Sequence, residues 1–269
     1  MAEAQVAAWP RPYFKATTQT TKILFLCFGR APLGEVKLDH ARFGLPDVEV
    51  ARSVELREYP RERSREWYEG WWHGAFGALA QQDLGEDLPL LLTSNVCYSL
   101  GLERPDRGDL VAAQTVWALA RWHCARGASV VLDVHAFRFR TRADVERLDF
   151  AQADVTRDVK IVLESEPTRD DLHLMHTRGL CKFARPELMC LIRAEDASLL
   201  GRLVNQVART LMEGATPEQI RLRVSDGVEL KTGPVSDAPL LESLGLEAAV
   251  ELRRSDGAEL AGIGRLVTP

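Results

Sequence analysis

The sequence has no long hydrophobic run, which limits the setting in which the protein works. Its longest apolar stretches, ILFLCF and LPLLL, are far shorter than the ~20 residues that a membrane-spanning helix needs. The opening residues, MAEAQVAAWPRPYFKATTQTT, lack the basic and apolar segments of a secretory signal. We therefore expect a soluble, cytoplasmic protein that does not bind a membrane.

Cysteine is scarce, and its spacing does not suggest disulfides. The sequence contains five cysteines, an odd number, with no C-x-x-C pair among them. A secreted protein would be left with an unpaired thiol, so a reducing compartment is the simpler setting. The five positions are Cys27, Cys97, Cys124, Cys181 and Cys190.

Recognisable cofactor and nucleophile motifs are also missing. There is no G-x-G-x-x-G loop, no Walker loop and no G-x-S-x-G elbow, so we expect no cofactor. The net charge of −5 disfavours broad affinity for nucleic acid. The stretch REYPRERSREWYEGWW combines arginine with aromatic residues, but its glutamates nearly cancel the arginines, so we expect no nucleic-acid partner.

The hydrophobic pattern predicts an α+β fold with a mixed, largely antiparallel sheet, about three main helices and two C-terminal β-hairpins. Residues 1–20 are expected to form a flexible arm and 21–269 a single domain, with a possible weak subdivision near 150–158. Strands are expected at 21–29, 45–56, 88–96, 128–137, 159–165, 172–179 and 186–192. Helices are expected at 64–82, 108–127 and 195–214, and hairpins at 221–233 and 251–264, where Asp-Gly joins alternating segments.

Two groups of residues are candidates for catalysis or metal binding. Asp133 and His135 stand at positions i and i+2 of an expected strand and would share one face, where the carboxylate could orient the imidazole of a general base. A polar end to a core strand is the simpler interpretation. A second group has spacing H-x₂-H-x₄-C-x₈-C, which matches no common zinc pattern. Its members are His173, His176, Cys181 and Cys190.

The segment HTRGLCKFARPELMC, residues 176–190, has the chain's highest concentration of side chains that could bind or react. Gly179 favours a turn after a strand, and Pro186 suits the start of the next strand. This connection gathers four charged residues at one end, either as a structural corner or as a binding patch. These residues are Arg178, Lys182, Arg185 and Glu187.

The same segment resembles a signature of small uncharacterised bacterial domains. From Thr177 to Leu188, T-R-G-L and F-A-R-P-E-L are similar to T-x-G-[LM]…F-G-x-P-E-[LI], with Ala184 in place of glycine. Some of those domains are suspected immunity or accessory proteins of polymorphic toxin systems. The resemblance implies no catalytic residue.

These observations favour a cytoplasmic bacterial protein that binds another protein without catalysis, as an immunity-like or accessory factor. One alternative is a hydrolase-type enzyme of unrecognised class near Asp133 and His135. That alternative requires Arg178 and Glu187 to converge on the same pocket. A second alternative is a structural subunit of a larger assembly, which would present the aromatic segment 67–76 as an exposed apolar patch.

Overall fold

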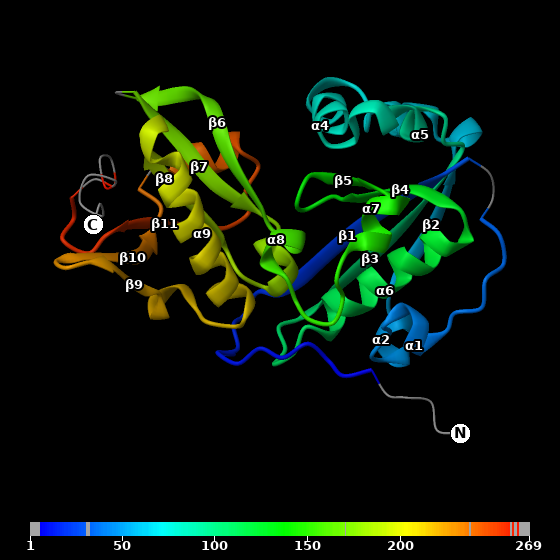
Figure 1. The fold of residues 1–269 in the computed structure, drawn as a ribbon, viewed down its shortest axis with the longest axis horizontal. Helices are drawn as coiled ribbons and strands as arrows, with labels where there is room; N and C mark the ends of the chain where they lie inside the picture. Colours follow the sequence, from blue (N-terminus) through cyan, green and yellow to red (C-terminus); the bar gives the residue numbers. More distant parts are fainter. Residues whose placement is uncertain are drawn as a thin grey trace. The chain divides into compact units, whose positions relative to one another are not determined.

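The computed structural model describes residues 6–30, 33–169, 171–236 and 238–258, together with 260 and 263. The fold is α+β, as the sequence predicts, with two sheets in which only one strand pair is parallel among the described residues. The chain divides into two compact units (Figure 1). The first contains Met1–Pro10, Thr20–Pro105 and Asp109–Ala153, and the second contains Arg11–Gln19, Asp106–Gly108 and Asp154–Pro269.

The first unit is a five-stranded sheet in the order β2-β3-β1-β4-β5, with helices on both faces. Its strands are β1 (Thr20–Gly29), β2 (Glu55–Pro60), β3 (Val96–Pro105), β4 (Ala128–Asp133) and β5 (Arg138–Thr141). Its helices are α1 (His40–Phe43), α2 (Val48–Arg52), α3 (Arg65–Glu69), α4 (Gly74–Leu84), α5 (Leu88–Leu92), α6 (Val111–Arg126) and α7 (Arg142–Arg147), with 3-10 turns η1 (Arg61–Arg63) and η2 (Gly85–Asp87).

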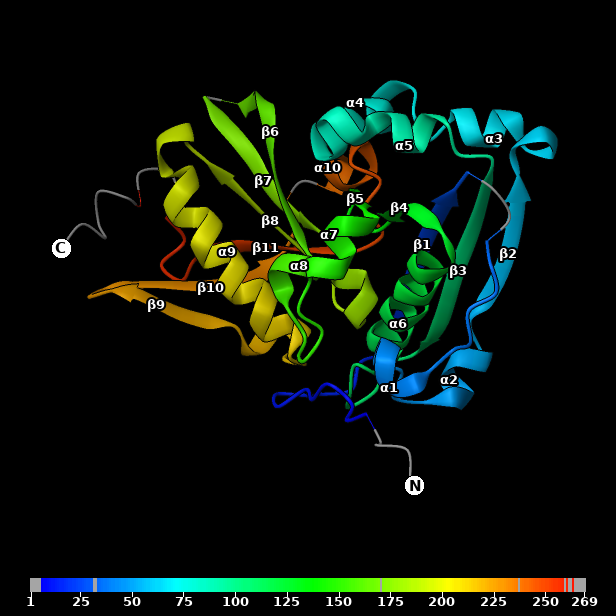
Figure 2. The same ribbon diagram turned by 45° about the vertical axis from the view of Figure 1, so that its right-hand side comes forward.

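Alternation along the strands builds two cores in this unit. On one face Phe25 packs edge-on against Trp117 of α6, with ring centroids 4.6 Å apart. On the other face Leu26, Phe28 and Leu132 pack against residues of α3, α4 and α5. Figure 2 shows α6 on one side of this sheet and the α3–α5 layer across it. The sheet therefore holds α6 in place beside β1, β3 and β4.

The second unit is a six-stranded sheet in the order β6-β7-β8-β11-β10-β9, with α9 packed on β6, β7 and β8. Its strands are β6 (Lys160–Arg169), β7 (Leu172–Arg178), β8 (Glu187–Ile192), β9 (Arg221–Ser225), β10 (Val228–Pro234) and β11 (Ala249–Arg254). Its helices are α8 (Val155–Asp158), α9 (Ala197–Met212) and α10 (Ala238–Ser243), with 3-10 turns η3 (Leu180–Phe183), η4 (Ala194–Asp196) and η5 (Pro217–Gln219).

Long, strongly patterned segments fold as the sequence predicts. The strand expected at 21–29 is β1, and the helices expected at 108–127 and 195–214 are α6 and α9. Gly127 ends α6 with a left-handed φ of 117°, the conformation in which glycine carries no steric penalty. The hairpin expected at 221–233 is formed by β9 and β10.

Three expected elements are wrong. Residues 45–56 are not one strand, because Asp47 accepts hydrogen bonds from the N–H groups of Glu49 and Val50 and starts α2. The run LPLLL forms α5, with proline in its first turn, where a missing N–H costs little. The aromatic helix expected at 64–82 is interrupted between α3 and α4.

The two ends of the chain also differ from expectation. Residues 6–20 are mostly exposed, but two side chains within them are buried, Trp9 and Arg11. Trp9 is 2% exposed, and its backbone N–H donates to the Gln114 side chain at 3.0 Å. The first arm of the hairpin expected at 251–264 belongs to β11, which pairs antiparallel with β10 and parallel with β8. Much of the expected second arm, at 259, 261–262 and 264, lies outside the described residues.

Candidate functional site

The corner between β7 and β8 is organised around the buried carboxylate of Glu187. Gly179 leaves β7 with a left-handed φ of 111° and turns the chain into η3. Oε1 of Glu187 accepts hydrogen bonds from the N–H groups of Gly179 and Leu180, at 2.8 and 2.9 Å. Oε2 accepts from the Thr177 hydroxyl at 2.7 Å. Glu187 is 6% exposed, and this burial raises the pKa of its carboxyl group despite the donors around it.

Lys182 and Arg185, two other predicted binding residues, are also inside the second unit. Lys182 is 2% exposed and lies 3.9 Å from the Asp158 carboxylate, which Arg157 holds at 2.7 Å. Arg185 is 1% exposed and donates to Asp106 at 2.7 Å. Of the four predicted residues only Arg178 is half-exposed, and its guanidinium donates to the Leu244 carbonyl at 2.5 Å.

Asp106 links this corner to two distant parts of the chain. Its two carboxylate oxygens each accept from an arginine, Oδ1 from Arg11 and Oδ2 from Arg185. Arg185 also donates to backbone carbonyls of Lys15, Ala184, Gly214 and Ala215. Within the second unit, Arg185 and Lys182 thus pair with carboxylates, whereas Glu187 and Arg178 are hydrogen-bonded to neutral groups. This arrangement fits a structural corner rather than an exposed patch.

The residues predicted as metal ligands are dispersed along β7, η3 and β8. His173 Nδ1 lies 3.1 Å from the Glu164 carbonyl, whereas His176 Nε2 lies 3.0 Å from the Glu164 carboxylate. Cys190 is 1% exposed, and burial raises the pKa of its thiol to about 12, while Cys181 is half-buried. No three His, Cys, Asp or Glu side chains in the described part of the chain gather as a metal site would require.

Asp133 and His135 lie at the end of β4 and in the turn that leads to β5. Asp133 is 2% exposed, and its Oδ1 accepts from the N–H of Ala136 at 3.1 Å. A short acidic side chain bonded to the backbone three residues later stabilises a turn. The two residues belong to the first unit, whereas Arg178 and Glu187 belong to the second.

The aromatic segment 67–76 packs inward. Tyr68 is fully buried, and Trp67 stacks on Tyr59 with ring centroids 4.3 Å apart. No residue of this segment is among the large hydrophobic residues found exposed in the described chain. Those exposed residues are Tyr13, Val48, Leu56, Leu92 and Leu163.

The surface beside β2 was not anticipated from the sequence. β2 is an outermost strand of its sheet, and no described strand pairs with its outer edge. Its residues alternate, so Leu56, Glu58 and Pro60 share one face of the sheet, and Leu56 is 50% exposed. Two hollows adjoin this face, one lined by charged side chains and the other by apolar ones.

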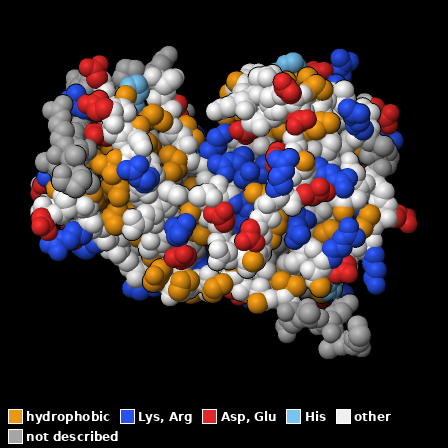
Figure 3. All heavy atoms as spheres, viewed as in Figure 1, with side chains coloured by type: hydrophobic (Ala, Val, Ile, Leu, Met, Phe, Trp, Pro, Cys, Tyr) orange, Lys and Arg blue, Asp and Glu red, His pale blue; other side chains and the backbone are white. Residues whose placement is uncertain are grey.

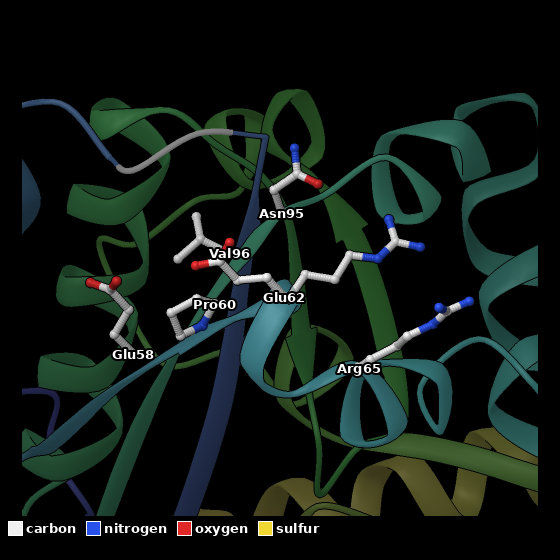
Figure 4. Close-up of a pocket in the computed structure, with 7 residues that line it drawn as sticks. Glu58, Pro60, Glu62, Arg65, Asn95 and Val96 are labelled. Carbon is white, nitrogen blue, oxygen red and sulfur yellow. The ribbon is translucent and has the colours of Figure 1, made fainter.

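The charged hollow has a volume of about 590 Å³ (Figure 4). Arg61 is fixed on its wall, because its guanidinium donates to the Leu92 carbonyl at 2.9 Å and lies over the Trp72 ring. Figure 4 shows the Glu58 and Arg65 side chains pointing in opposite directions, so these charges do not converge on one point. The lining residues are Glu58, Pro60, Arg61, Glu62, Arg65, Asn95 and Val96.

The apolar hollow has a volume of about 390 Å³ and lies between β2, β3, α6 and the α1–α2 segment. Its aliphatic lining comes from Leu38, Leu45, Val48, Ala51, Val54, Leu56, Leu100 and Leu119. Trp122, His123, His40 and Arg52 complete it. Val48 and Leu56 are the most exposed of its large apolar side chains.

Apolar side chains form several separate areas on the face seen in Figure 3, and Lys and Arg side chains gather near the middle of this view. Arg142 and Glu146 form one of the exposed ion pairs of the first unit, at 2.7 Å. No described helix is both long and apolar enough to cross a membrane. Comparisons with models of protein families, with curated proteins and with solved structures gave no match to this chain.

Proposed function

We propose that this chain is a non-catalytic binding protein that captures an extended segment of a partner protein along the outer edge of β2. The observation that carries the proposal is the unpaired edge of this strand together with the exposed Leu56. In this proposal the protein acts as an accessory factor, as an immunity protein does when it holds its toxin.

An edge strand presents a row of backbone N–H and C=O groups to any extended chain that approaches it. Proteins commonly protect such edges with proline, charge or a covering segment, because unprotected edges pair readily. β2 spans six residues, of which the first four are exposed, and its charged residues Glu55, Arg57 and Glu58 and its terminal Pro60 are protections of this kind. The edge would therefore select a strand of complementary charge rather than any extended chain. A strand added here would gain main-chain hydrogen bonds, the usual source of affinity when a peptide extends a sheet.

The two hollows would supply the specificity that main-chain bonds lack. Alternate side chains of an added strand would lie over the face that carries Leu56 and Glu58. Near Leu56 the apolar hollow favours an aliphatic or aromatic side chain. Near Glu58 the charged hollow, with Glu62 and Arg65, favours a polar or charged one. The partner is therefore expected to present a strand with an apolar residue followed by polar ones.

The segment that resembles immunity-related domains supports this proposal indirectly. Thr177, Gly179 and Glu187 of that segment bond to one another within the second unit. Because these residues lie in the interior, the signature they form would stabilise the fold, and the contacts with a partner would be made by other residues. The immunity-like role itself rests on the resemblance.

The test is quantitative capture of partner from native lysate by tagged wild-type protein and two matched variants. Leu56→Arg places a charge on β2, while Leu163→Arg makes the same change at a similarly exposed leucine on edge strand β6. The proposal expects one stoichiometric protein that is retained by Leu163→Arg and reduced at least tenfold by Leu56→Arg. Equal capture by both variants, or no specific capture by wild type, would refute it.

A further inference from the structure

His123 has an unusual position for a polar side chain. It belongs to α6 and lines the apolar hollow of the first unit, yet it is 0% exposed. Neither ring nitrogen has a hydrogen-bond partner among the described residues. Its nearest ring neighbours are Tyr98 and Trp122, with centroids at 5.1 and 5.0 Å. Buried polar groups are usually bonded, so two unpartnered nitrogens on one ring require an explanation.

The protonation state of the His123 ring determines which groups could hydrogen-bond to its nitrogens. Burial lowers the pKa of His123 to about 3, with a smaller contribution from the charge of Arg126, so the imidazole is neutral near pH 7. A neutral imidazole offers one N–H donor and one nitrogen acceptor. A hydroxyl group can serve either nitrogen, because it both donates and accepts.

The hollow around the ring is suited to a small molecule with an apolar body. Its volume of about 390 Å³ falls within the range typical of ligand sites, roughly 300–1,000 Å³. Most of its lining is aliphatic, so the remainder of a ligand would meet carbon atoms. Arg52, the one guanidinium on the lining, is exposed and already pairs with Glu49 at 2.6 Å, which leaves no strong demand for an anion.

We propose that the apolar hollow binds a small, uncharged molecule with an apolar body and one hydroxyl group, and that this hydroxyl hydrogen-bonds to a ring nitrogen of His123. A phenol or a short-chain alcohol has this chemistry. This inference goes beyond partner capture at β2 and needs only the hollow and the histidine; a partner side chain that entered the hollow near Leu56 would compete with the small molecule.

The test compares two probes that differ by one hydroxyl group, 4-ethylphenol and ethylbenzene, titrated into the full-length protein by calorimetry. Wild type should bind 4-ethylphenol about fivefold more tightly, the ratio that one net hydrogen bond provides. In His123→Phe, which keeps a ring beside Tyr98 and Trp122, this preference should disappear while ethylbenzene binds as before. The matched control is His73→Phe, at an exposed histidine outside the hollow, which should behave as wild type.

A second measurement requires no variant. The ¹⁵N resonances of the His123 ring in wild-type protein should shift on addition of 4-ethylphenol and stay nearly unchanged with ethylbenzene. Equal affinity for the two probes, no binding of either, or a preference that survives His123→Phe would overturn the proposal. Unchanged His123 resonances with bound 4-ethylphenol would overturn it even if the variant failed to fold.

Discussion

Replacing Asp106 by alanine is expected to destabilise the second unit much more than removal of a surface carboxylate. The Asp106 side chain is fully buried and bridges the guanidinium groups of Arg11 and Arg185, whose side chains are also buried. It thus joins three segments that are distant in sequence and belong to one compact unit. The bridge is one of the contacts that tie residues 11–19 to the second unit.

The loss of unfolding free energy in Asp106→Ala depends on the buried groups that lose their partner. Without Asp106, two buried guanidinium groups lose their shared counter-ion, although backbone carbonyls still accept from both. Removing one partner of a buried ion pair typically costs about 3–5 kcal/mol. The matched control is Glu49→Ala, whose exposed pair with Arg52 is 2.6 Å long and is expected to contribute about 0–1 kcal/mol.

Urea unfolding followed by two signals measures the effect and locates it. All six tryptophans lie in the first unit, so their fluorescence reports on that unit, while far-UV circular dichroism reports on both. With a slope near ~2 kcal/mol per molar urea, the dichroism midpoint of the second unit should fall by about 2 M in Asp106→Ala. The fluorescence midpoint should stay in place. A midpoint no lower than that of Glu49→Ala would show that the Asp106 bridge does not stabilise the second unit as proposed.

Two further substitutions test buried groups by the same unfolding assay. Glu187→Gln turns one accepting oxygen into a donor and should lower the unfolding free energy by about 2 kcal/mol. Because burial raises the pKa of Glu187, its protonation adds to the unfolding free energy below the pKa of the unfolded chain. This contribution is lost as pH rises through the raised pKa of the folded state, and Glu187→Gln should not show the loss. Because burial lowers the pKa of His123 from 6.5 to about 3, the first unit should lose up to about 1.4 kcal/mol per pH unit as pH falls through that interval. His123→Phe should remove this slope, and an unchanged slope would contradict the assignment.

The fold was predictable where one local signal dominated. In α6 the apolar stripe and the terminal Gly127 agree, and in α9 the buried residues Leu200, Val204 and Val207 follow the helical period. In short apolar runs, no second local signal supported one type of element over the other. LPLLL fits a buried strand and a short helix equally well by composition, and its tertiary setting selected the helix α5.

The candidate site was much less predictable, because burial depends on partners far away in the sequence. Arg185 and Glu187 were recognisable as a charged group, but the first is neutralised by Asp106, 79 residues away. The exposure of Leu56 depends on the position of β2 at the end of the strand order, which a hydrophobic pattern does not encode. The isolation of His123 likewise arises only when α6 packs beside β3.

Hydrogen–deuterium exchange of the chain, with and without its captured partner, tests whether a partner strand pairs with β2. We expect slower exchange of the backbone amides of Glu55–Tyr59 in β2 in the complex, because the added strand would cover the outer edge of this strand. Unchanged exchange in β2, with new protection confined to another part of the chain, would contradict it.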